Sequence, residues 1–154
     1  LHLQGEQLTD NGLRQLSHLT KLQALDIQST RSNGEVLAEL KQAPLEVLAV
    51  RRISDETAQL LENFPSLTSL TVYDSPMTDR GFKVITNLRR LQTLRIRNCP
   101  QITSEGFPGL KKMRSLKSLD LIDTPIGDES LALLSNLGLR TLRLNSEQIT
   151  DTGM

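Results

Sequence analysis

The sequence predicts an α/β solenoid in which short parallel strands form one sheet and helices cover its outer side. Three observations indicate this class. A leucine frame recurs with a nearly fixed period, apolar residues alternate within each frame, and a second apolar set at helical spacing follows it. Neither the strand nor the helix of one repeat can bury its apolar face alone, so the repeats must stack into a continuous core.

The leucine frame reads Leu-x-x-Leu-x-(Leu/Ile/Val) and occurs six times in 154 residues. The copies begin at Leu22, Leu45, Leu67, Leu91, Leu116 and Leu139, with spacings of 22 to 25 residues. Leu1-His2-Leu3 is the end of an earlier copy. Alternation within each copy is typical of a strand with one buried face. Strands joined by helical crossovers pair in parallel, so we expect seven parallel strands.

A helix is expected after each frame, because apolar residues recur there at intervals of three and keep one face inward. The sets are Leu13-Leu16-Leu19, Leu37-Leu40-Ala43, Ala58-Leu61-Phe64, Phe82-Ile85-Leu88, Phe107-Leu110-Met113 and Leu131-Leu134-Leu137. A Thr, Ser or Gly before the helix is the expected N-cap, and an acid just inside favours the positive helix end. Pro108 lies inside its set, so that segment should be short or 3₁₀-like.

Two copies depart from the pattern. The copy at Leu45 lacks two residues between Val50 and Ile53, which predicts a tighter turn, and the copy at Leu22 carries polar Ser32 at an apolar position. The chain opens in mid-strand and stops at residue 154, where a helix should begin. Since terminal repeats normally carry a polar cap, we expect residues 1–154 to be a single domain and a fragment of a longer repeat array.

Composition argues against several classes of function. Eighteen basic and 18 acidic residues leave no net field to attract nucleic acid, and no apolar run is long enough for membrane insertion. A single cysteine cannot form an internal disulfide, and two histidines alone do not predict a metal site. His2 is expected beside Gln4 on the first strand, where the repeat pattern places no nucleophile that it could activate. No phosphate loop or dinucleotide motif occurs. We therefore expect no catalytic residues, no cofactor and no enzyme.

The repeat resembles the leucine-rich repeat family, and more narrowly its cysteine-containing subtype. The closest copy runs from Leu91 to Phe107 and contains Cys99, and the resemblance covers nearly the whole chain. Other copies carry Thr30, Ser75 and Thr124 at the position of Cys99. Small polar side chains there can satisfy turn backbone groups, so we predict a buried ladder rather than a reactive thiol.

The resemblance implies a curved horseshoe with a parallel concave sheet and convex helices. It also implies a non-catalytic module that binds a protein or peptide through its concave face. Members of the subtype often resemble substrate-recognition arms of ubiquitin ligases that carry an F-box, a segment not present in this sequence. That role in a longer parent chain and a structural spacer are the alternatives.

Outward strand residues line the concave face in this family, and here they include four arginines and two aspartates. The candidate partner-binding residues are Arg51, Tyr73, Arg95, Arg97, Asp120, Ile122 and Arg143. Adjacent strands lie about 4.8 Å apart, so most of this set falls within roughly 15 Å. Arg and Tyr commonly anchor interfaces, which predicts a protein or peptide partner of acidic or phosphorylated character.

The charges within this set are expected to interact in a particular way. Asp120 stands beside Arg95 and Arg143 and should pair with one of them across the sheet. Arg97 and Arg51 then remain as the better-exposed pair. The alternative is that these outward positions are simply polar, with no partner.

Overall fold

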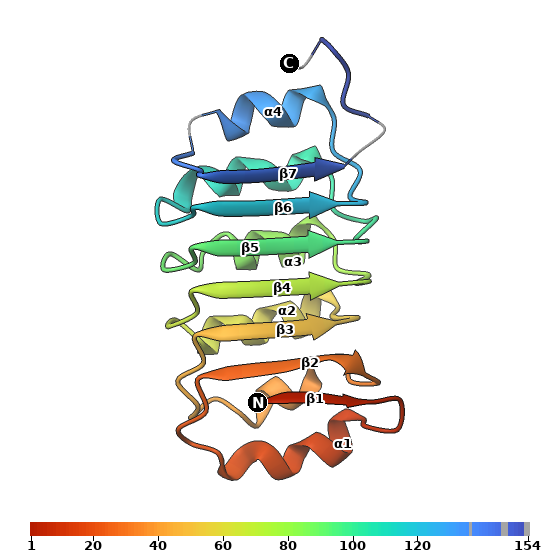
Figure 1. Cartoon of the computed structure of the whole chain (residues 1–154), viewed down its shortest axis with the longest axis vertical. Coiled ribbons are helices and arrows are strands. Elements are labelled where there is room, and N and C mark those ends of the chain that lie inside the picture. The colour runs from red at the N-terminus through yellow and green to blue at the C-terminus, as the bar shows by residue number, and fades with distance from the viewer. Residues whose placement is uncertain (136, 146–147, 153–154) are drawn as a thin grey trace.

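The structure is a computed structural model that describes residues 1–135, 137–145 and 148–152. Its seven strands form one parallel sheet in chain order, as predicted (Figure 1). They are β1 (His2–Gly5), β2 (Ala24–Thr30), β3 (Val47–Arg51), β4 (Ser69–Tyr73), β5 (Thr93–Arg97), β6 (Ser118–Ile122) and β7 (Thr141–Asn145). The helix start expected at the end of the chain falls largely on residues 153–154, outside the described residues.

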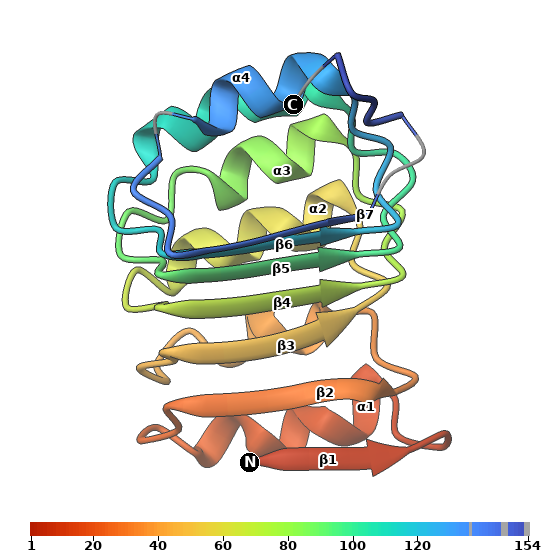
Figure 2. The same ribbon diagram turned by 45° about the horizontal axis from the view of Figure 1, so that its top comes forward.

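Helical segments cover one side of this sheet (Figure 2). The α-helices are α1 (Asp10–Leu13), α2 (Asp55–Gln59), α3 (Asp79–Ile85) and α4 (Asp128–Leu134). The 3₁₀ helices are η1 (Arg14–His18), η2 (Glu35–Ala38), η3 (Leu60–Asn63) and η4 (Ser104–Lys112), and η4 contains Pro108 as predicted. Apolar residues at intervals of three suit the three residues per turn of a 3₁₀ helix, which explains why so much of this side is 3₁₀. None of the described helices is long and apolar enough to cross a membrane.

Strand register places the outward residues of β3 to β7 in three rows that cross the sheet. The first row is Val47 followed by four residues that carry a hydroxyl, and we call it the hydroxyl row: Val47, Ser69, Thr93, Ser118 and Thr141. The middle row is Ala49, Thr71, Arg95, Asp120 and Arg143. The edge row is Arg51, Tyr73, Arg97, Ile122 and Asn145. The residues between them point into the core, and Leu48, Leu70, Leu94 and Leu119 form one buried column. The face that carries the three rows lies opposite the helices and is the predicted concave face.

Polar turn residues form the predicted ladder behind the strands. Ser75 and Cys99 are buried, and the Ser75 hydroxyl donates to the carbonyl of Tyr73 at 2.8 Å. The Cys99 thiol donates in the same way to the carbonyl of Arg97 at 3.4 Å. Burial raises the pKa of Cys99 to about 11, so the nucleophilic thiolate is scarce at neutral pH.

An acidic residue in the first turn of several helices reaches into the following repeat. The Asp55 carboxylate accepts hydrogen bonds from the Thr78 N–H at 2.8 Å, the Thr78 hydroxyl at 2.7 Å and the Gly81 N–H at 2.9 Å. Asp79 accepts the same pair of bonds from Thr103, at 2.8 and 2.7 Å. Asp10 and Asp128 bind the next repeat in a similar way. We call these four carboxylates the inter-repeat staples.

The staples extend the role expected for these acids. The sequence predicted that each acid favours its own helix, whereas the carboxylates also cap the next one. The expected side-chain N-caps are present at Ser54, Thr78 and Thr103, each of which accepts a backbone N–H. Thr9 and Gly127 make no such bond.

Glycine residues make room for two of the staples. A Cβ added to Gly81 would lie 2.6 Å from Asp55 Oδ1, and one added to Gly106 would lie 2.6 Å from Asp79 Oδ1. Where the staple acid is replaced by Gly34 or Ser104, the following repeat carries Thr57 or Ser130 instead of glycine. Val36, which follows Asp10 and donates to it at 2.8 Å, is the exception.

Removing the Asp55 staple should destabilise the fold in a pH-dependent way. Burial alone would raise the pKa of Asp55, but the hydrogen bonds from Thr78 and Gly81 lower it overall from its ordinary value of 3.8. A carboxyl whose folded pKa is lowered stabilises the fold above its unfolded pKa, and this stabilisation is lost as pH falls through the folded pKa. We expect Asp55→Ala to cost about 2 kcal/mol at pH 7 and clearly less below about pH 3.

Urea denaturation of the chain and of Asp55→Ala at both pH values measures this difference. The control is Glu39→Ala, at an exposed acidic position. A cost for Asp55→Ala that stays constant from pH 7 to pH 3 would show that the charge of the staple does not contribute.

Candidate functional site

The concave face brings together all seven predicted partner-binding residues. The edge row places Arg51, Tyr73, Arg97 and Ile122 on consecutive strands. Arg95, Asp120 and Arg143 occupy consecutive places of the middle row, on β5, β6 and β7. Strand register, which follows from the leucine frame, is therefore sufficient to assemble this surface.

Asp120 pairs with a different arginine from the one expected. Arg97 Nη2 donates to Asp120 Oδ2 at 2.5 Å, although Arg95 and Arg143 are the residues directly opposite in register. Long side chains on a sheet reach diagonal neighbours, and here the guanidinium crosses from the edge row to the middle row. Asp120 is only 2% exposed, so it acts as a buried anchor for Arg97. This hydrogen bond raises the pKa of Arg97, which keeps the guanidinium charged.

Arg51 is held by a carboxylate that the sequence interpretation missed. Its Nε and Nη2 both lie 2.6 Å from Asp74 Oδ2, while Asp74 Oδ1 accepts from the Asn98 amide at 2.7 Å. The bond from Asn98, together with the bond and charge of Arg51, lowers the pKa of Asp74. Arg97 and Arg51 are therefore not the better-exposed pair that was expected, because both are half-buried and ion-paired, whereas Arg143 is exposed.

Asp74 lies just beyond the strand frame, which is why the outward-facing pattern did not include it. Its backbone is left-handed, with φ of 43°, and Arg52, Asn98 and Asp123 share this conformation at the same turn. Asn and Asp tolerate left-handed backbone better than most residues. An Asp or Asn two residues after the end of three of the frames, at Asp74, Asn98 and Asp123, is the sequence signal of this turn.

Tyr73 and Arg97 lie side by side in the edge row and form what we call the platform. The Arg97 guanidinium carbon lies 6.0 Å from the centre of the Tyr73 ring, at the range of a cation–π contact. Tyr73 and Ile122 are both half-buried. Asp120 thus fixes the Arg97 guanidinium near the ring, and Asp74 fixes Arg51 on the strand next to Tyr73.

Arg95 and Arg143 stand apart from these ion pairs. Within the described residues, neither side chain makes a hydrogen bond or ion pair, and Arg143 is exposed while Arg95 is half-buried. They lie on either side of Asp120, whose bond goes to Arg97. They are therefore the two arginines of the concave face that lack a partnering carboxylate in this part of the chain.

Comparison with known proteins identifies the architecture. A family model described as "Leucine Rich repeat" matches residues 112–135. An internalin C2 (inlC2) from Listeria monocytogenes superposes with a TM-score of 0.75 at 23% identity, over 97% of this chain and 62% of that one. An internalin (inlF) from the same organism gives a TM-score of 0.64 at 22% identity, over 90% of this chain and 46% of that one. The fold is a leucine-rich repeat solenoid.

The chain spans 46% and 62% of the lengths of these two internalins. No curated protein matches its sequence. Leucine-rich repeat domains generally bind proteins and are usually non-catalytic. The cysteine-containing subtype stays a prediction, since neither the family model nor the two structures name it.

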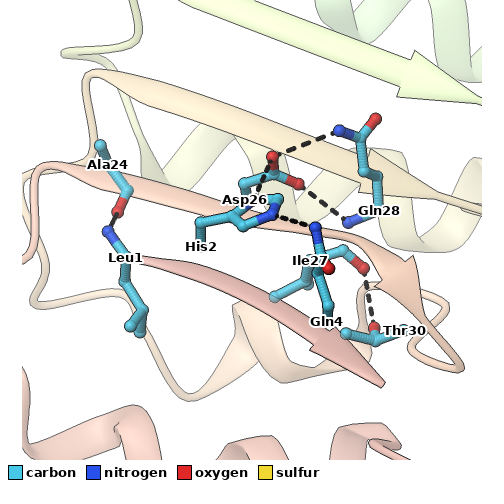
Figure 3. A network of polar contacts seen from close by, with 8 residues as sticks. All are labelled: Leu1, His2, Gln4, Ala24, Asp26, Ile27, Gln28 and Thr30. Carbon is cyan, nitrogen blue, oxygen red and sulfur yellow. Dashed lines mark hydrogen bonds and ion pairs between the residues drawn. The ribbon is translucent and has the colours of Figure 1, made fainter. Parts of the chain in front are cut away.

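The N-terminal end of the sheet carries a second polar network, which Figure 3 shows from close by. His2 Nδ1 lies 2.7 Å from Asp26 Oδ2, and the Gln4 amide nitrogen lies 2.6 Å from His2 Nε2. A neutral ring protonated at Nδ1 satisfies both contacts. Gln28 donates to Asp26 from its backbone and from its side chain, each at 3.2 Å. Asp26 is thus engaged at its own end of the sheet.

The same network engages the His2 imidazole. Both of its ring nitrogens are occupied by neighbouring side chains. The part of the chain that the structure describes contains no group of three His, Cys, Asp or Glu residues placed to hold a metal ion.

Proposed function

We propose that this leucine-rich repeat domain is a non-catalytic recognition module whose concave face binds a protein or peptide. The observation that carries the proposal is the platform of Tyr73 and Arg97 beside the Arg51–Asp74 pair. Tyr and Arg supply much of the binding energy in protein interfaces. Side chains that are already fixed lose less conformational entropy on binding. Arg97 is fixed by Asp120, and Arg51 beside the platform is fixed by Asp74.

Each residue of the candidate site has a distinct proposed role. Tyr73, Arg97 and Ile122 provide contact area, and Arg51 borders a shallow hollow with Gln28 and Asp74 that suits a partner side chain. Asp120 is too buried to touch a partner, so its role is to position Arg97. Arg95 and Arg143 add unpaired positive charge at the side of the platform. A structural spacer has no need of such a preorganised surface.

Tyr73→Ala should weaken binding of a partner by about 1 to 3 kcal/mol, which is roughly 5-fold to 150-fold in Kd. The partner is recovered by pull-down with the full chain, and its affinity for each variant is measured by calorimetry. Lys112→Ala is the matched control, because Lys112 is exposed at the end of η4 on the helical side. Loss of binding in Lys112→Ala with retention in Tyr73→Ala would place recognition on the helices instead.

Arg97→Ala is a less clean test of binding than Tyr73→Ala. It removes the only hydrogen-bond partner that the described residues give to the buried Asp120 carboxylate. An unpaired buried charge destabilises the fold strongly, so lost binding would be mixed with lost structure. Tyr73→Ala leaves the Arg97–Asp120 bond in place and therefore reports on contact with the partner.

A further inference from the structure

We propose that Arg95 and Arg143 form a subsite for a phosphorylated side chain of the protein partner. The inference rests on the proposed function, since it concerns one part of the same concave face. It starts from the charges of that face. Arg51 is paired with Asp74 and Arg97 with Asp120, at 2.6 and 2.5 Å, and Asp26 lies on β2 and is bonded to His2 and Gln28. Arg95 and Arg143 therefore carry the positive charge of this face that the described carboxylates leave unpaired.

Arg95 and Arg143 start from the two strands on either side of β6. In register, Arg95 on β5 and Arg143 on β7 flank Asp120 on β6, so their backbones stand two strand spacings apart, about 10 Å. Arg97 shows that an arginine on β5 can reach across to β6, because its guanidinium bonds Asp120 there. Arg95 from one side and Arg143 from the other can thus meet over the buried Asp120 side chain.

Hydroxyl groups border the same spot. Thr93, Ser118 and Thr141 occupy the hydroxyl row on these three strands, two residues before Arg95, Asp120 and Arg143. Within the described part of the chain none of the three hydroxyls makes a side-chain hydrogen bond, so each can donate to a ligand oxygen. Two guanidinium groups that can reach over Asp120, with hydroxyl donors two residues away on the same three strands, supply the donors that an anion site needs.

A phosphate monoester fits this arrangement better than a carboxylate. It carries a charge close to −2 at neutral pH, which matches the two unpaired arginines. Its three terminal oxygens diverge, so they can accept from guanidinium groups on opposite sides of β6 and from a hydroxyl between them. A carboxylate offers two oxygens in one plane, which suits a single guanidinium. The next row holds Tyr73, Arg97 and Ile122, so residues flanking a phosphorylated side chain would lie on the proposed platform.

The probe is a capped pentapeptide, Ala-Ala-phosphoserine-Ala-Ala, titrated into the full chain while the arginine Nε–Hε resonances are followed by NMR. We expect saturable shifts at Arg95 and Arg143, and at least tenfold weaker binding in the double variant Arg95→Gln/Arg143→Gln. The same peptide with glutamate in place of phosphoserine should bind at least threefold more weakly. The matched control is Lys112→Gln/Arg140→Gln, which loses the same two positive charges at exposed positions, one at the end of η4 and one just before β7.

Three outcomes would overturn the subsite. They are equal shifts at all exposed arginines including Arg140, unchanged binding in the double variant, or a glutamate peptide that binds as well as the phosphopeptide. Folding of the double variant is checked by its melting temperature, which should not change because neither side chain has a described partner. A pulled-down partner that needs Tyr73 but not the two arginines would refute the subsite and leave the proposed function standing. A partner indifferent to Tyr73→Ala would refute the proposed function itself, whatever the phosphopeptide does.

Discussion

Leu119→Ala should lower the free energy of unfolding by about 2 to 5 kcal/mol. Leu119 lies on β6 with no exposed surface, and it packs in register between Leu94 of β5 and Leu142 of β7. Truncation removes buried methyl groups and leaves a cavity in the middle of the stack, where both neighbouring repeats are fixed by their own packing. A solenoid is stabilised by contacts between nearest neighbours, so a cavity there weakens two interfaces together.

The matched control for Leu119→Ala is Leu142→Ala, in the same column at the last strand. Leu142 is 43% exposed, so its truncation should cost less than about 1 kcal/mol. Urea denaturation monitored by circular dichroism measures both variants. Equal losses at the two positions would contradict the nearest-neighbour description of the stack.

Gly81→Ala should be the second strongly destabilising change, with a loss of about 3 kcal/mol. The added Cβ would lie 2.4 Å from Met77 Cγ and 2.6 Å from Asp55 Oδ1. Met77 is fully buried, which limits its room to move. Displacing Asp55 instead breaks its hydrogen bonds to Thr78 and to the Gly81 N–H. Either response costs stability, through strain in the core or through loss of a staple.

Gly12→Ala provides the control, because Gly12 occupies the same place in an earlier repeat. A Cβ there meets nothing within 4 Å, since no staple reaches it. Alanine favours helix over glycine by about 0.5 to 1 kcal/mol, so this change should be neutral or slightly stabilising. Thermal denaturation of the two variants separates the effects. Similar destabilisation at both positions would show that the close approach at Gly81 is not the cause.

The strands and the composition of the concave face could be predicted from sequence because both follow from the period of two. Once the leucines of a frame are inside, the residues between them must face outward, and parallel pairing in chain order aligns them. The ion pairs could not be predicted in the same way. Register fixes where a side chain begins, but the guanidinium of a long arginine has several acceptors in reach, and Asp120 therefore paired with Arg97 rather than Arg95.

The staples were hidden for a different reason. An acid in the first turn of a helix is already explained by the helix dipole, so the positions of Asp55 and Asp79 alone do not indicate a second role. The signal was a correlation between repeats. One repeat after Asp55 and Asp79, the chain carries a glycine, at Gly81 and Gly106. One repeat after the two positions where the acid is missing, it carries Thr57 and Ser130 instead. A pattern compared within single repeats does not contain this information.

The staples also restrict how a chain of this kind can gain or exchange repeats. Asp55 and Gly81 are 26 residues apart, and Asp79 and Gly106 are 27 apart, so each acid and its glycine lie in different repeats. A recombination that joined the repeat of Asp55 directly to the one carrying Ser130 would bring a Cβ against the carboxylate. Breakpoints that keep each acid with its downstream glycine avoid this clash. Two adjacent repeats, rather than one, are therefore the unit that can be moved intact at these junctions.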